Sequence, residues 1–154
     1  MKKDNKGFSL VELIVVVLIM GILAVALTPQ VMKWVNNSRI SSDIQTQNSV
    51  VASIQISLTD NAALTACDSN FHKVTVSKAD GLKIYSGSAA GSETTAAETD
   101  GFGVALLGNL DQTAANIKAK SVASFSIAVA NKAGGYKITP DATLISNAST
   151  AGLE

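Results

Sequence analysis

The stretch FSLVELIVVVLIMGILAVALTPQVM, residues 8–32, decides the fold of this 154-residue chain. Glu12 is its only charged side chain, and the 20 residues from 13 to 32 carry no charge. As an α-helix rising about 1.5 Å per residue, those residues span roughly 30 Å, the thickness of the hydrocarbon core of a bilayer. The sequence therefore predicts that residues 8–32 form a transmembrane helix.

The residues that precede this stretch, MKKDNKG at positions 1–7, are short, polar and net basic. Their three lysines favour a cytoplasmic N-terminus by the positive-inside rule, with the rest of the chain exported. Two simpler interpretations remain open at this point. One is an ordinary secretory signal, for which AVA at residues 24–26 fits the cleavage pattern, and the other is a plain membrane anchor. Neither explains Glu12.

Glu12 is the unusual residue of the apolar stretch. A charged side chain costs about 2.5–3.5 kcal/mol at the centre of a bilayer, and less near the edge where Glu12 would lie. Such a residue usually has a partner and a function. The alternative is that Glu12 merely extends to the lipid headgroups.

The string GFSLVE at residues 7–12 resembles the class III signal of type IV prepilins and pseudopilins. In that family a membrane-embedded prepilin peptidase cleaves after the glycine, here Gly7. The same enzyme N-methylates the new N-terminus, here Phe8. The family glutamate lies fifth in the processed chain, and Glu12 occupies that place. The motif is highly specific, and the resemblance covers about residues 2–38.

Gly21 and Pro29 fall where type IV pilins commonly carry a glycine and a proline that loosen the helix. Pro29 lacks the N–H that would bond the carbonyl of Val25, which costs about 3 kcal/mol in a helix interior. We predict that the helix kinks or opens between Gly21 and Pro29 in the assembled filament. The alternative is that both residues are tolerated, because transmembrane helices contain more Gly and Pro than soluble ones.

The resemblance also implies an assembly mechanism and a set of partners. Glu12 is expected to pair with the N-terminal amine of a neighbouring subunit, because an ammonium stabilises a carboxylate in a low-dielectric core. The pairing would fix the axial register, since a misplaced subunit leaves a buried charge unmatched. The implied partners are the prepilin peptidase, an inner-membrane pilus assembly platform, the membrane before assembly, and copies of the chain in a helical filament. The formal net charge of zero gives no indication of nucleic-acid binding.

Beyond the apolar stretch, the helix is predicted to continue as an amphipathic helix to about residue 58. Its apolar residues recur at helical spacing, at Ile40, Ile44, Val51, Ile54 and Leu58. Its polar residues are expected on the opposite face, at Arg39, Ser42, Asp43, Gln45 and Asn48. The predicted divisions are therefore a leader (1–7), a transmembrane and filament-core helix (8–32), its amphipathic continuation (33–59) and a β-rich globular domain (60–154).

The globular domain alternates polar and apolar residues in short runs bounded by turn residues. Strands are predicted at residues 72–78, 82–84, 121–130, 136–139 and 142–145, the last two forming one strand broken at Pro140 or two short ones. Asp80-Gly81 marks a hairpin turn, residues 86–99 read as a loop, and residues 103–110 fit a short helix or a strand. The predicted fold is α+β and ladle-like: the apolar half of the helix protrudes, and its second half packs on an antiparallel sheet of three or four strands.

Candidates for chemistry are few. Cys67 is the only cysteine, so no intrachain disulfide is possible. His72 is the only histidine. Cys67, His72 and Asp68 could be imagined as a metal site or as a nucleophile–base pair. Their spacing does not match a dense ligand motif such as C-x2-C. A part-buried cysteine and a loop histidine are therefore expected instead. Asp100 and Asp111 lie too far apart for an EF-hand calcium loop. No catalytic residue, metal or cofactor is predicted, and the chain is not expected to be an enzyme.

The favoured function is that of a structural subunit of a type IV pilus, a single-pass membrane protein that becomes an extracellular filament at the cell surface. A pseudopilin of a type II secretion or DNA-uptake system is the first alternative. The second is a monomeric membrane-anchored extracellular binding domain. The residues do not distinguish adhesion, twitching motility, DNA uptake and secretion.

Overall fold

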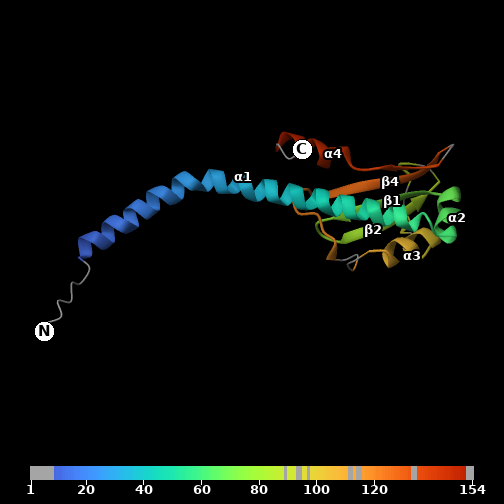
Figure 1. Ribbon diagram of the computed structural model, residues 1–154, viewed down its shortest axis with the longest axis horizontal. Helices are drawn as coiled ribbons and strands as arrows, with labels where there is room; N and C mark the ends of the chain where they lie inside the picture. Colours follow the sequence, from blue (N-terminus) through green and yellow to red (C-terminus); the bar gives the residue numbers. More distant parts are fainter. Residues whose placement is uncertain are drawn as a thin grey trace, which may run out of the picture. The chain divides into compact units, whose positions relative to one another are not determined.

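The computed structural model describes residues 9–88, 90–92, 95–96, 98–110, 113, 116–132 and 135–151 (Figure 1). The chain divides into two compact units, Met1–Asn36 and Asn37–Glu154. One helix, α1 (Leu10–Ser57), supplies residues to both units. The predicted fold class is confirmed, because a long N-terminal helix is combined with a small antiparallel sheet on which its second half packs.

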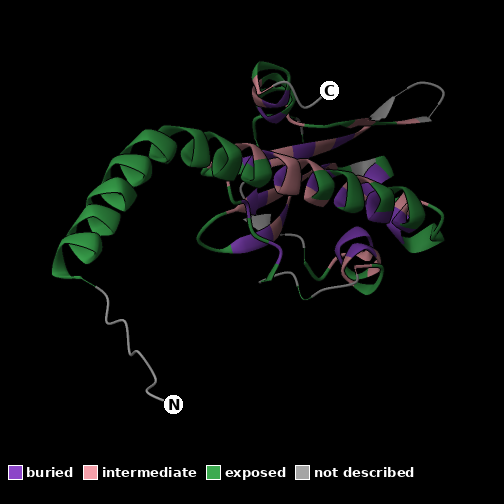
Figure 2. Ribbon diagram, turned by 60° about the vertical axis from the view of Figure 1, so that its left-hand side comes forward, coloured by how far each residue is buried: buried purple, intermediate pink, exposed green. Residues whose placement is uncertain are grey.

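In the first unit, every residue of α1 is exposed to solvent, as Figure 2 shows. Its large apolar side chains are between 40% (Val35) and 77% (Val25) exposed. The helix is long and apolar enough to cross a membrane. A helix that is apolar all round requires lipid or other apolar helices about it rather than water.

In the second unit, α1 buries one face on the sheet. The buried residues recur every three or four positions, at Ile40, Asp43, Gln47, Val50, Ser53, Ile54 and Ser57. Of the residues predicted for this face, Ile40 and Ile54 are buried, while Ile44, Val51 and Leu58 are partly buried against the core. The placement of Asp43 on the opposite face was wrong: its side chain is fully buried because its carboxylate bonds a distant loop.

The sheet contains five antiparallel strands. They are β1 (Phe71–Ser77), β2 (Gly81–Gly87), β3 (Thr95–Ala96), β4 (Ser124–Lys132) and β5 (Gly135–Thr139), arranged in the order β3-β2-β1-β4-β5. The predicted hairpin is confirmed, with Ser77 opposite Gly81 and Gly81 at a φ of 82°. A glycine adopts this left-handed conformation without steric cost. The two-residue strand β3 lies within the segment that was predicted to be a loop.

Alternate residues of β1 and β4 are buried and contribute to the core, which also includes residues of α1. His72, Val74 and Val76 of β1 are buried, and their neighbours in β1 are only partly buried. The largest fully buried apolar side chains come from all layers of the unit: Ile54, Ile84, Phe102, Leu106, Phe125, Ile127 and Leu144.

The described residues of the second unit also form three short helices: α2 (Asn61–Ser69), α3 (Gly101–Gly108) and α4 (Ala142–Thr150). The segment 103–110, which fitted either a helix or a strand, lies largely in helix α3. Helix α2 was not predicted. The predicted strand at residues 142–145 was wrong, because these residues form the first turn of α4. Asp141 caps this helix by accepting a hydrogen bond from the backbone N–H of Thr143 at 2.8 Å. Leu144 and Ala148, four residues apart, are its buried face.

Candidate functional site

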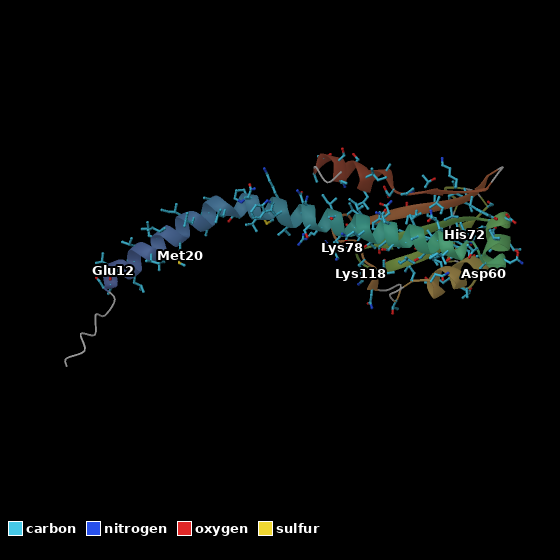
Figure 3. All side chains as sticks on the ribbon, in the orientation of Figure 1. Glu12, Met20, Asp60, His72, Lys78 and Lys118 are labelled. Carbon is cyan, nitrogen blue, oxygen red and sulfur yellow. The ribbon has the colours of Figure 1, made fainter. Side chains whose placement is uncertain are left out.

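The predicted processing site lies at the N-terminus of the chain. Gly7 and Phe8 are outside the described residues, so the structure gives no account of the cleavage site. Glu12 lies in the first turn of α1 (Figure 3). Its Oε2 atom accepts a hydrogen bond from the backbone N–H of Ser9 at 2.9 Å. This places the one carboxylate of the apolar stretch at its N-terminal edge.

The surface that follows Glu12 is apolar on every side of the helix. From Leu13 to Met32 no side chain carries a charge, and all of them are exposed. Exposed apolar surface is unfavourable in water by roughly 25 cal/mol for each Å². The surface is therefore suited to lipid, to other apolar helices, or to each in turn.

Gly21 and Pro29 both lie within the continuous helix. No heavy atom lies within 4 Å of the position that a Cβ would take at Gly21. Near Pro29, the hydroxyl of Thr28 donates to the carbonyl oxygen of Ala24 at 2.7 Å. These observations describe a single chain, so the kink in the filament stays a prediction.

The second half of α1 is fixed to the globular unit through Asp43. Its Oδ1 atom accepts a hydrogen bond from the backbone N–H of Lys120 at 2.7 Å. Its Oδ2 atom accepts from the backbone N–H and the hydroxyl of Ser121 at 2.6 and 2.5 Å. The ammonium of Lys120 in turn donates to the hydroxyl of Ser42 at 2.7 Å. A buried carboxylate is tolerated when hydrogen bonds of this kind satisfy its oxygens.

Sequence reasoning missed this anchor although a signal for it was present. Positions 40, 43, 47, 50 and 54 form one helical stripe with spacings of three and four, and residue 43 belongs to it. Assigning Asp43 by its polarity, rather than by its position in the stripe, placed it on the wrong face.

His72 is fully buried in β1, so the prediction of a loop histidine was wrong. Its Nε2 atom lies 2.8 Å from Oδ2 of Asp100, and its Nδ1 atom lies 3.7 Å from the sulfur of Cys67. The ring of Phe102 packs beside it, with centroids 4.7 Å apart. A neutral imidazole satisfies both contacts if Nε2–H donates to Asp100 and Nδ1 accepts from the thiol.

The cluster around His72 joins α2, β1 and α3. Burial, together with the smaller effects of the charges of Asp100 and Asp68, raises the pKa of Cys67 to about 12. Because the thiolate is the nucleophilic form, this cysteine is a poor nucleophile at neutral pH. Asp100 also accepts from the backbone N–H of Gly103 at 2.7 Å and so caps α3. Within the part of the chain that the structure describes, no group of His, Cys, Asp or Glu is placed to hold a metal ion.

The side chains of Tyr136 and Asn37 form hydrogen bonds between elements of the globular unit that are far apart in the sequence. The hydroxyl of Tyr136 in β5 donates to Asp68 of α2 at 2.6 Å. This hydrogen bond is the main reason that the pKa of Tyr136 is raised to about 12. At the other edge, the side-chain amide of Asn37 donates to the carbonyl of Ala151 at 3.4 Å, so the end of α4 lies beside the first residue of the unit.

Comparisons with known proteins agree with the N-terminal motif and extend beyond it. A family profile described as "Prokaryotic N-terminal methylation motif" matches residues 2–28. A type IV major fimbrial protein FimA of Dichelobacter nodosus is 31% identical over 147 residues, covering 93% of this chain and 88% of the relative. A second FimA of the same organism is 30% identical over 107 residues, covering 69% of this chain and 64% of the relative. No solved structure matches the chain.

Proposed function

This chain belongs to the type IV pilin family, and we propose that it is a structural subunit of a type IV pilus. Cleavage after Gly7 would produce the mature subunit, and α1 would carry it first in the membrane and then in the filament. One observation supports this role most strongly: in the first unit, α1 exposes an uncharged, mostly apolar stretch from Leu13 to Met32, preceded by a single carboxylate, Glu12, in its first turn.

The exposed apolar helix explains both environments of the subunit. In the membrane its side chains face lipid, and in a filament they pack against the same helix of other copies. Association of helices in this way buries surface that would otherwise face water outside the cell. A soluble monomer would have no use for such a surface.

Processing supplies the partner for Glu12. Cleavage after Gly7 turns the nitrogen of Phe8 into a charged amine and removes the three lysines of the leader. Those lysines hold the N-terminus on the cytoplasmic side, so their removal eases withdrawal of the helix from the membrane. The new amine can then pair with Glu12 of a neighbouring copy, which fixes the register of the two subunits.

The partners follow from this sequence of events. We propose that a prepilin peptidase cleaves after Gly7 and methylates Phe8, and that an inner-membrane platform feeds the processed subunits into the filament. The N-terminus would face the cytoplasm before assembly, and the finished filament would lie at the cell surface. Both named relatives are described as major fimbrial proteins, which favours a pilus over the pseudopilin alternatives and over a monomeric anchor.

Mass spectrometry and electron microscopy of the exported protein test this function. We expect an N-terminus at methylated Phe8 and filaments that contain the chain. Glu12→Ala should be processed and inserted yet give far fewer filaments. Gln30→Ala, which removes an exposed uncharged polar side chain from the same helix, is the matched control and should assemble normally. An intact Met1 without filaments would contradict the proposal.

A further inference from the structure

The first turn of α1 holds Glu12 in place through the backbone of Ser9. The carbonyl of Ser9 accepts a hydrogen bond from the N–H of Leu13 at 3.2 Å, the first bond of the helix, which makes Ser9 its N-cap. The N–H of Ser9 donates to Oε2 of Glu12 at 2.9 Å. The sequence SLVE at residues 9–12 fits the S-x-x-E capping box, in which the glutamate reaches back to the N-cap amide.

Only one of the two carboxylate oxygens of Glu12, Oε2, takes part in this cap. Oε1 of Glu12 accepts no hydrogen bond from any residue that the structure describes. Because an ionised carboxylate has lone pairs on both oxygens, Oε1 can still accept from a second donor. The cap also restricts the rotamers of Glu12 within the single subunit, so this ordering is complete before a second donor arrives.

We propose that the Ser9 amide is a positioning group for filament assembly. It holds Glu12 by one carboxylate oxygen and leaves the other oriented for the N-terminal ammonium of the next subunit. This inference rests on the proposed function, because that ammonium exists only after cleavage at Gly7. In the single subunit the same bond keeps the carboxylate partnered in apolar surroundings.

The proposal separates two properties of Glu12 that a single alanine variant removes together. Glu12→Gln keeps an oxygen that can accept from Ser9, as glutamine does in natural capping boxes, and loses the charge. Ser9→Pro removes the donor N–H and keeps the charge. Ser9→Ala keeps the backbone N–H and removes only the hydroxyl, so it is the matched control for Ser9→Pro.

Amide hydrogen exchange of the processed full chain in detergent micelles tests the cap directly. The Ser9 amide should exchange about fivefold more slowly in the wild type than in Glu12→Ala, the factor that corresponds to a typical cap of about 1 kcal/mol. Glu12→Gln should lie closer to the wild type than to the alanine variant. The Leu13 amide, which bonds Ser9, serves as the internal reference. Equal Ser9 exchange in all three proteins would overturn the proposal.

Filament yield tests the positioning role in variants whose mass shows cleavage after Gly7. Ser9→Ala should assemble like the wild type, and Ser9→Pro should yield at least fivefold fewer filaments although Glu12 is intact. Wild-type yield from cleaved Ser9→Pro would overturn the proposal. If the wild type itself formed no filaments, the proposed function would fail, while the exchange comparison would still decide whether Glu12 caps Ser9.

Discussion

At the scale of single residues, two carboxylates of α1 have opposite surroundings. Glu12 is exposed in an apolar first turn, whereas Asp43 is fully buried in the globular unit. Each accepts hydrogen bonds from backbone amides, which stabilise a carboxylate without an ion pair. Among the described residues, only one oxygen of Glu12 accepts a hydrogen bond, whereas both oxygens of Asp43 accept hydrogen bonds within the chain.

Replacing Asp43 by alanine should destabilise the globular unit strongly. The change leaves the backbone amides of Lys120 and Ser121 and the Ser121 hydroxyl without their acceptor. Because each unsatisfied buried polar group costs about 1–3 kcal/mol, we expect a loss of about 3 kcal/mol in the free energy of unfolding. Urea unfolding in mild detergent, followed by circular dichroism, measures this loss. The exposed Gln45→Ala is the control on the same helix, and equal stability of the two variants would refute the anchoring role of Asp43.

Alkaline pH should weaken the fold through Cys67 and Tyr136. Their pKa values are raised from 9.0 and 10.0 to about 12 in the folded chain, so the unfolded chain loses these protons first. The stability that they contribute is complete below about pH 9 and is lost as the pH rises toward 12. Tyr136→Phe should flatten the part of this decline between pH 10 and pH 12, the window of Tyr136 itself. Tyr85→Phe, which removes a hydroxyl with no carboxylate partner among the described residues, should leave the decline unchanged.

The N-terminal motif could be recognised from the sequence, whereas the partners of the buried residues Asp43 and His72 could not. Glu12 is conspicuous because a long apolar run contains no other charge. The helical stripe of α1 indicates that Asp43 is buried, but its partner Ser121 is 78 residues away, and Asp100, the partner of His72, is 28 residues away. Pairings at such distances are set by the tertiary fold and leave no local pattern.

At the scale of elements, periodicity predicted the long helix and the β1–β2 hairpin, while the short helices required capping signals. Asp60, Asp100 and Asp141 each precede a short helix, and each accepts a hydrogen bond from its first turn. Segment 142–145 (ATLI) has the composition of a strand, yet the cap at Asp141 begins a helix there. Helices of eight or nine residues contain too few turns for an apolar period to identify them.

The contact between α2 and α3 depends on a glycine. A Cβ added to Gly101 would lie 2.5 Å from the carbonyl oxygen of Ala62. Because this oxygen belongs to the backbone, it cannot avoid the clash by a change of rotamer. We therefore expect Gly101→Ala to lower the free energy of unfolding by about 1–3 kcal/mol, the usual cost of overpacking.

Gly108→Ala provides the matched control for Gly101→Ala within the same helix. A Cβ at Gly108 meets no atom within 4 Å, and alanine favours a helix by up to about 1 kcal/mol over glycine. This variant should be as stable as the wild type or slightly more stable in thermal unfolding. A Gly101→Ala variant that melted at the same temperature as Gly108→Ala would show that α2 and α3 do not approach closely.

At the scale of the whole molecule, the exposed apolar surface and the buried core belong to different parts of the chain. The continuous apolar surface lies in Met1–Asn36, while the core of Asn37–Glu154 is closed by its own helices and strands. The sequence predicts a division near this point, because the apolar run stops at residue 32. The position of the boundary remains a prediction.

A fragment that begins at Asn37 should therefore fold as a soluble monomer. It retains the residues that anchor α1, namely Ile40, Asp43, Val50 and Ile54, and it loses the exposed apolar helix. Among the described residues of the fragment, the only exposed large apolar side chains are the isolated Ile56, Val104 and Ile145, so sedimentation should give the mass of one chain in the absence of detergent. The same fragment carrying Asp43→Ala is the control for folding and should unfold at a lower urea concentration. Precipitation of the unmodified fragment would show that residues 1–36 belong to the fold of the globular unit and do not form a separable assembly element.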